Sequence, residues 1–317
     1  MLSLSVSIVP IFLLLMIGAL CQRWRFPADG FWSGVDKLAY WVLFPALLFS
    51  NTSTMDFSNP LLFRYGLILL LAMAGTAVFV FACAFMLKVK APVTSSMLQA
   101  GVRFNTFLTL ALASSLYGAQ GLTLAVLGAS VLIPSINVFV VVSMVLLHGK
   151  STALQRGKAV PSLSQLVINA LIRNPLIVSI VLGAGLNLAG LTPIPLVSDT
   201  VSILAKAALP MVLLAVGASV RFEVIRSVGM TFVWSAVARF VVFTGLVALS
   251  CWWLGITGVP ALVAILFGVV PTAASGYALA RQLGGDSERM AAFITLQTLL
   301  CVVTLPVSVL LSQHIFG

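Results

Sequence analysis

Long apolar runs, separated by short polar connections, make up almost the whole chain. Runs of about 18 to 27 residues are long enough to cross a hydrocarbon core roughly 30 Å thick as helices. The pattern therefore predicts an all-α integral membrane protein with ten spans, at residues 3–21, 35–53, 62–87, 94–116, 121–147, 164–189, 197–219, 229–254, 259–280 and 290–313.

The composition supports the same class. Hydrophobic residues make up 61% of the 317 residues and charged residues 8%, and the mean hydropathy is +1.17. A soluble domain could not carry this composition on its surface. The net charge of +10 comes from basic residues that stand singly or in small groups at span ends. There they would meet membrane lipid head groups, and this dispersed placement argues against nucleic acid as a partner.

The basic residues also predict the orientation, because Lys and Arg in short loops are retained on the cytoplasmic side. Among the even-numbered connections and the two termini, only Arg64 is basic. Both termini are therefore expected to be extracytoplasmic, in a multi-pass protein of the cell inner (plasma) membrane. Twelve basic residues follow odd-numbered spans: Arg23, Arg25, Lys37, Lys88, Lys90, Lys150, Arg156, Lys158, Arg221, Arg226, Arg281 and Arg289.

The second half of the chain repeats features of the first about 165 residues later. An odd number of spans per half makes the two copies inverted, an arrangement found in secondary transporters with a binding site at the midplane. The matches are mostly prolines and glycines in equivalent spans: Pro10 with Pro175, Gly18 with Gly183, Pro45 with Pro210, Gly118 with Gly284, and His148 with His314.

This repeat sets the expected domain organisation. Residues 1–317 form a single membrane domain. It consists of a first five-helix repeat at 1–148, a cytoplasmic linker at 149–164, and a second inverted five-helix repeat at 165–317. The linker is the longest polar stretch and is too short to fold as a domain.

Span 9 contains a proline near its middle, Pro271, followed by small and polar residues. Proline removes a backbone donor and displaces the carbonyl four residues back. Freed backbone groups at membrane depth persist only beside protein or a water-filled cavity. The repeat register places Asn105 opposite Pro271 and pairs Thr106 with Thr272. We therefore predict broken helices in spans 4 and 9 that cross at the midplane, with helix N-termini that attract an anion; a simple packing kink is the alternative.

Polar residues elsewhere in the spans extend this candidate site. Arg103 is either a counter-ion for an anionic substrate or a support of the fold. Arg239 and Lys206 also lie inside apolar runs and are expected to pair with a carbonyl or line a cavity. Uncharged polar groups in spans favour helix-to-helix hydrogen bonds. The candidate substrate-binding residues are Arg103, Asn105, Thr106, Asn137, Pro271, Thr272, Ser275 and Gln297.

The sequence offers no pattern for catalysis or for a cofactor. The four cysteines stand singly, without the Cys-x-x-Cys pair of a metal or redox site. No zinc-protease His-Glu-x-x-His is present. We therefore expect no metal, no cofactor and no enzymatic activity, only binding and translocation.

Four segments, taken in order, resemble the auxin efflux carrier family, whose bacterial members are permeases for malonate, malate or unknown substrates. Each is weak alone, but together they extend over nearly the whole chain. They are residues 36–49 (DKLAYWVLFPALLF) in span 2, 104–106 (FNT) in span 4, 173–176 (RNPL) in span 6, and 271–286 in span 9 and the loop that follows.

The resemblance implies a fold related to bile-acid sodium symporters. Spans 1, 2, 6 and 7 would form a scaffold domain and spans 3–5 and 8–10 a transport domain. An elevator-like shift would expose an anion bound at the span 4–9 crossing to each side in turn. Family members often have a proline beside the span 4 asparagine, where this chain has Phe104. The break in span 4 is therefore expected to be smaller than the break in span 9.

These observations predict a secondary transporter for a small organic anion, a mono- or dicarboxylate resembling malonate, malate or auxin. A coupling proton or sodium ion and a homodimer stay open. One alternative is a sodium-coupled symporter of the bile-acid type, although only Asp36, Asp199 and Glu223 offer carboxylates near the spans. An alternative of another class is a membrane sensor or receptor with a transporter-like fold.

Overall fold

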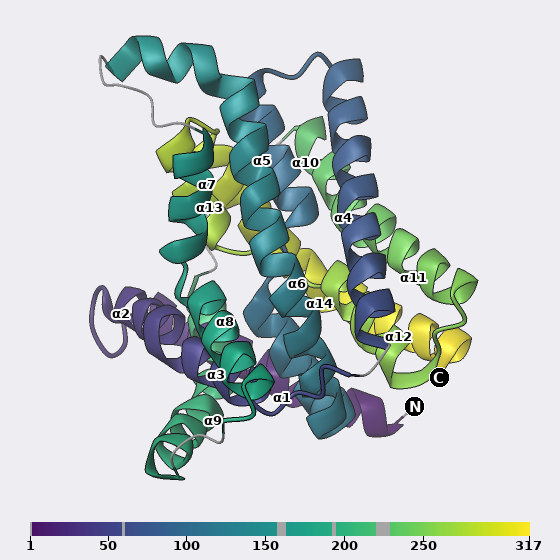
Figure 1. The fold of residues 1–317 in the computed structure, drawn as a ribbon. Helices are drawn as coiled ribbons and strands as arrows, with labels where there is room; N and C mark the ends of the chain where they lie inside the picture. Colours follow the sequence, from purple (N-terminus) through teal and green to yellow (C-terminus); the bar gives the residue numbers. More distant parts are fainter. Residues whose placement is uncertain (1, 59–60, 157–162, 192–194, 220–228) are drawn as a thin grey trace. The chain divides into compact units, whose positions relative to one another are not determined.

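The computed structural model describes residues 2–58, 61–156, 163–191, 195–219 and 229–317. Within these ranges the regular structure is helical and contains no strand, which confirms the all-α prediction (Figure 1). Part of the predicted linker, residues 157–162, lies outside the described residues. So do Lys158, Arg221, Glu223 and Arg226.

Five helical stretches of the described chain are long and apolar enough to cross a membrane. They are Leu61–Met86, Ala91–His148, Pro195–Ala218, Met230–Trp253 and Ser287–Phe316. Shorter apolar helices occupy Val9–Arg23, Pro175–Leu188 and Gly258–Val269. All ten predicted apolar segments contain helix, but that each of them crosses the membrane stays a prediction.

The chain divides into two compact units. The first consists of Met1–Gly66, Phe107–Ile133 and Ile172–Val220, and the second of Leu67–Thr106, Pro134–Leu171 and Arg221–Gly317. Expected spans 1, 2 and 7 belong to the first unit, and expected span 6 belongs to it from Ile172 onward. Residues 107–133 also belong to it, although the family resemblance assigned spans 4 and 5 entirely to the other domain.

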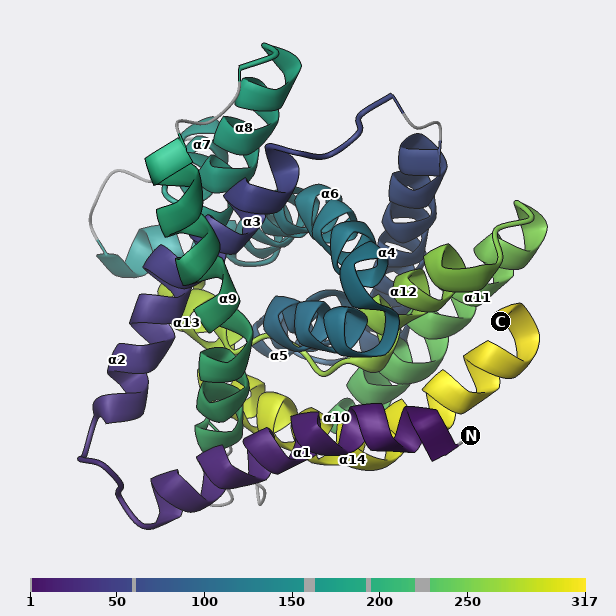
Figure 2. The same ribbon diagram turned by 90° about the horizontal axis from the view of Figure 1, so that it is seen from below.

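The first unit is built from helices that cross at close range. The helices that lie wholly or largely in it are α1 (Leu2–Arg23), α2 (Phe31–Leu38), the π-helical turn η1 (Ala39–Leu43), α3 (Phe44–Thr52), α8 (Pro175–Leu188) and α9 (Pro195–Ala218). α1 crosses α9, and α3 packs against both α8 and α9 (Figure 2). The wide turn η1 directly precedes α3, where Pro45 stands in the first turn and supplies no backbone N–H.

Glycines permit two of these close crossings. A Cβ atom on Gly18 of α1 would collide with the carbonyl of Leu214 in α9, and a Cβ atom on Gly217 of α9 would collide with the carbonyl of Leu15 in α1. Gly183 of α8 meets α3 in the same way, against Thr52 and Phe49. The repeat-matched glycines 18 and 183 therefore both lie where backbones touch.

The second unit contains two interruptions between helices, one after α5 (Ala91–Val102) and one after α12 (Gly258–Val269). α4 (Leu61–Met86) lies mostly in this unit, and α6 (Thr106–Arg156) contributes its second half. In its first half, which belongs to the first unit, α6 is interrupted at Gly118, whose φ of 60° and ψ of −147° are not helical. The other elements of the unit are α7 (Leu163–Ile172), α10 (Met230–Ala236), the π-helical segment η3 (Val237–Phe243), α11 (Thr244–Trp253), α13 (Ser275–Leu283) and α14 (Ser287–Phe316).

The centre of this unit is α5, which packs against α10, η3, α13 and α14. α12 packs against α11, η3 and α14. Almost every residue of α5 and α12 is buried. The ends of these two helices therefore lie in protein, the condition under which interrupted backbone is tolerated at membrane depth.

Candidate functional site

The two helix breaks meet through a backbone hydrogen bond in the second unit. α5 ends at Val102 and the next helix begins at Thr106; α12 ends at Val269 and α13 begins at Ser275. Between these ends, the N–H of Asn105 donates to the carbonyl oxygen of Pro271 at 2.8 Å. The repeat register paired these two residues in sequence, and this bond places their backbones in contact.

The break after α5 is the shorter of the two. Residues 103–105 are non-helical there, whereas residues 270–274 are non-helical after α12. This difference agrees with the expectation drawn from Phe104, which stands where related chains often have proline. The Phe104 ring also packs edge-on against Phe267 of α12, with ring centroids 4.9 Å apart.

Gln297 of α14 ties the two breaks together with its carboxamide. Its Oε1 accepts a hydrogen bond from the N–H of Thr272 at 2.9 Å, and its Nε2 donates to the carbonyl of Ala100 at 3.2 Å. The Thr272 hydroxyl donates to the carbonyl of Gln99 at 3.3 Å. Because Gln297 is 0% exposed, these bonds satisfy backbone groups that would otherwise be buried without partners.

Arg239 in η3 binds the ends of both α5 and α12. Its Nε donates to the carbonyl of Val270 at 2.9 Å and its Nη1 to the carbonyl of Gly101 at 3.4 Å. Helix C-termini carry partial negative charge, so two helix ends compensate one guanidinium. The Phe243 ring lies 4.8 Å from Arg239 Cζ and adds a cation–π contact.

This geometry confirms the expectation that Arg239 pairs with carbonyls. The side chain is 0% exposed, and its Nη2 atom has no hydrogen-bond partner in the described part of the chain. Lys206, the other cation for which that expectation was stated, is exposed on α9. The buried guanidinium therefore contributes positive charge close to the crossover.

Arg103, which directly follows α5, holds the beginning of α13. Its Nη1 donates to Ser275 Oγ at 3.2 Å and its Nη2 to Asn137 Oδ1 at 2.8 Å. The side chain is buried, so snorkelling to the membrane surface is not its conformation here. The structure thus brings three predicted site residues into one hydrogen-bonded group, with Asn137 contributing from α6.

Asn105 and Thr106 stand at the opening of α6. Asn105 is buried and precedes the first helical residue, Thr106, which is half-buried. Ser275 occupies the equivalent position in α13. A helix N-terminus, which carries the positive end of the helix dipole, therefore follows each of the two breaks in the chain.

Gln99 is a polar residue of this region that the sequence reading did not single out. It is 0% exposed, and its Nε2 lies 3.7 Å from Met144 Sδ. Its Oε1 has no hydrogen-bond partner among the described residues and faces Gly276 of α13. An amide inside an apolar run was the available signal, the same signal that identified Gln297.

The described residues contain no group of three or more His, Cys, Asp or Glu side chains able to hold a metal ion. Asp36 and Asp199, two of the carboxylates considered for sodium, belong to the first unit. The crossover residues described above belong to the second. Their donor set consists of guanidinium, amide, hydroxyl and backbone groups.

Comparison with protein families gives a match over nearly the whole chain. Residues 3–309 match the model of a family described as membrane transport protein. This model represents the membrane region of the auxin efflux carrier family as a whole. The match confirms the resemblance drawn from the four sequence segments. No curated protein matches the chain.

Proposed function

Because the chain belongs to the membrane transport protein family, a family of multi-pass membrane proteins that handle small molecules, we propose that it is a secondary carrier for a small organic anion. The expected substrates are mono- or dicarboxylates resembling malonate, malate or auxin. The expected location is the cell inner membrane, with both termini extracytoplasmic. The proposal rests on the crossover of the second unit.

The observation that carries the anion assignment is the pair of buried guanidinium groups beside the breaks. Arg239 is compensated by helix carbonyls, and Arg103 is bound to neutral amide and hydroxyl groups. Buried cations are costly unless they have partners. An anion near Arg103 and the N-termini of α6 and α13 would gain from both guanidinium charge and helix dipoles.

The proposed ligand set is the predicted one. Asn105, Thr106, Pro271 and Thr272 frame the site, Arg103 pairs with the anion, and Ser275 and Asn137 hold Arg103 while no anion is bound. Gln297 acts on the backbone, because both polar ends of its side chain already bond to Thr272 and Ala100. An arriving carboxylate would compete with Ser275 and Asn137 for the guanidinium.

The transport mechanism that we propose is alternating access of the elevator type, in a fold of ten spans arranged as two inverted repeats. Two features support the repeat: Asn105 contacts Pro271 at the predicted register, and Gly18 and Gly183 both occupy close helix crossings. The division into two compact units supports rigid-body movement. The unit that holds the crossover would be the moving one.

The test is thermal stabilisation of the purified protein by mono- and dicarboxylates, indole acetate and bile acids, with and without sodium. The wild type is compared with Asn105→Ala, which keeps the backbone N–H that binds Pro271 and removes only the side-chain amide. A ligand at 100 times its Kd stabilises the folded state by about 2.7 kcal/mol. Stabilisation of the wild type alone supports the site, and sodium dependence favours the bile-acid type of symport. Equal stabilisation of both proteins, or none of either, would sink the assignment.

A further inference from the structure

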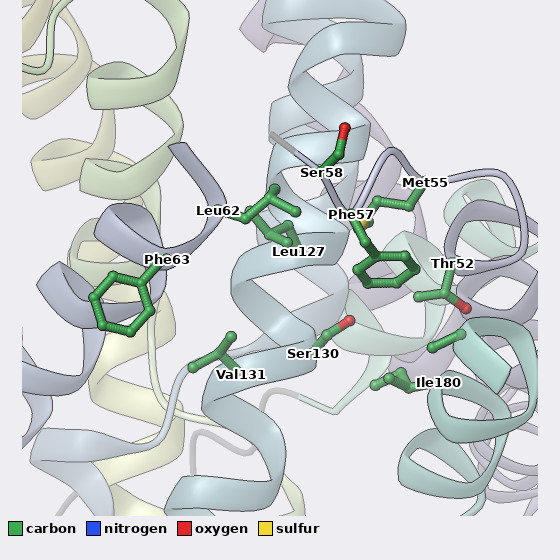
Figure 3. Close-up of a pocket in the computed structure, with 11 residues that line it drawn as sticks. Thr52, Met55, Phe57, Ser58, Leu62, Phe63, Leu127, Ser130, Val131 and Ile180 are labelled. Atoms are coloured by element: carbon green, nitrogen blue, oxygen red, sulfur yellow. The ribbon is translucent and has the colours of Figure 1, made fainter. Parts of the chain in front are cut away.

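The first unit contains a pocket of about 470 Å³ whose lining is mostly apolar. It lies among α3, the connection to α4, the first turn of α4, α6 and α8. Figure 3 shows Phe57, Thr52 and Ile180 grouped on one side, Leu62, Phe63 and Val131 on the other, and Leu127 and Ser130 between them. This volume falls within the range of ligand sites.

The hydroxyl groups of the pocket wall donate their protons within the protein. Thr52 Oγ1 donates to the carbonyl of Leu48 at 2.8 Å and Ser130 Oγ to the carbonyl of Val126 at 2.8 Å. Ser58 Oγ donates to Asp56 Oδ1 at 2.6 Å. The described lining residues include no charged side chain. The described walls therefore offer a carboxylate neither a cation nor a hydroxyl donor. A hydrocarbon chain needs no such partner.

Charged residues adjoin the lining residues on two of the chain segments that form the pocket, the connection after α3 and the first turn of α4. Asp56 stands between the lining residues Met55 and Phe57, and Arg64 directly follows Phe63. Both Asp56 and Arg64 are exposed. Hydrogen bonds from the hydroxyl and the backbone N–H of Ser58 lower the pKa of Asp56, so its carboxylate is charged at neutral pH.

Arg64 is also the exception to the charge asymmetry of the chain. It is the one basic residue in the connections and termini expected to be extracytoplasmic, a side where Lys and Arg are depleted. A lipid phosphate at the membrane surface would be its natural partner. A cation and an anion on two of the chain segments that line an apolar pocket match a head group that carries both charges.

We propose that this pocket binds a zwitterionic phospholipid with an ammonium-bearing head group. One acyl chain occupies the space bounded by Leu62, Leu127, Val131 and Ile180. The phosphate lies at Arg64 and the ammonium group at Asp56. The site is separate from the crossover and does not depend on which anion is transported.

Native mass spectrometry of the delipidated full-length protein tests the site. Dioleoyl phosphatidylethanolamine, phosphatidylcholine and phosphatidylglycerol are added separately, and the lipid-bound fraction is measured. We expect phosphatidylethanolamine to be retained several-fold more than phosphatidylglycerol. Arg64→Gln should lower the retention of all three lipids, and Asp56→Asn should abolish the preference for phosphatidylethanolamine. Arg173→Gln, which removes another exposed cation of the first unit, is the matched control and should bind as the wild type does.

Filling the pocket gives the second arm. Ser130→Leu and Ala184→Leu place bulk at two different lining helices, and each should lower the retention of all three lipids while the thermal midpoint stays close to that of the wild type. Unchanged retention in both variants, a preference for phosphatidylglycerol, or an Arg64→Gln protein that binds as the wild type does would overturn the proposal. Organic-anion stabilisation that is lost in Ser130→Leu and kept in Asn105→Ala would place the carried anion in this pocket, and would overturn it as well.

Discussion

The backbone N–H of Asn105 donates a hydrogen bond to the carbonyl of Pro271, 166 positions later in the chain, at a distance of 2.8 Å. This bond joins the two helix breaks directly. Around it, Gln297 and Arg239 bind the neighbouring backbone groups of both breaks. The crossover is therefore held by side chains that satisfy carbonyl and N–H groups released from helices.

Replacing Gln297 should destabilise the protein through the backbone of both breaks. Gln297→Leu removes an acceptor from the Thr272 N–H and a donor from the Ala100 carbonyl. Each buried group left unsatisfied costs about 1–3 kcal/mol. We expect a clear drop of the thermal midpoint in detergent. Thr298→Val is the matched control on the same helix, because the Thr298 hydroxyl donates to the carbonyl of Ile294 within that helix, and it should leave the midpoint nearly unchanged.

Arg239→Gln should be more damaging than the loss of an exposed cation. The substitution removes the fork that binds Val270 and Gly101 from a fully buried position. Hydrogen bonds to charged groups contribute about 1.5–3 kcal/mol each. Lys206→Gln removes a cation that is exposed on α9 and should be neutral in the same thermal assay. Equal midpoints for the two variants would contradict the bridging role of Arg239.

Gly183 and Gly185 allow a comparison within one helix. A Cβ atom on Gly183 would lie 2.8 Å from the carbonyl oxygen of Phe49 and would collide with Thr52, whereas Gly185 faces open space. Gly183→Ala should cost about 1–3 kcal/mol because α8 must move from α3. Gly185→Ala should be neutral or stabilise by up to about 1 kcal/mol. The thermal midpoints of the two variants test this difference. A Gly183→Ala protein as stable as the wild type would contradict the close approach of α8 to α3.

Arg103 and Asn137 should show energetic coupling that depends on the anion. Without ligand, Asn137 accepts a hydrogen bond from Arg103 at 2.8 Å, so Arg103→Gln and Asn137→Ala should be non-additive in a double-mutant cycle of thermal stability. If a carboxylate takes over the guanidinium, Asn137→Ala keeps most of the stabilisation by the anion and Arg103→Gln loses it. The reverse pattern would assign ligand binding to Asn137.

The sequence predicted the position of the crossover better than its chemistry. Internal symmetry located Asn105 opposite Pro271, because a repeat transfers register from one half to the other. Phe104 indicated the smaller break, since proline was missing there. The partners of Gln297 and Arg239 were not predictable, because they lie in other helices and depend on how those helices pack. Gln99 was missed for the same reason, because its position beside α13 depends on how α5 and α13 pack.

The boundary of the two units also could not be derived from the spans. The family resemblance assigned whole spans to each domain, but residues 107–133 group with the first unit. This segment begins one residue after the helix restarts at Thr106 and extends past the non-helical Gly118. A helix break uncouples the halves of a span, so the two halves are free to pack in different units.

The most direct test of an anion site at the crossover is uptake of the best-stabilising carboxylate into proteoliposomes. Initial rates are compared for the wild type, Arg103→Gln, Asn105→Ala and the surface control Arg173→Gln, at matched amounts of folded protein. The account predicts saturable uptake by the wild type and the control, and a loss of at least about tenfold, equivalent to about 1.4 kcal/mol, in each crossover variant. Uptake by Arg103→Gln and Asn105→Ala at the wild-type rate would contradict it.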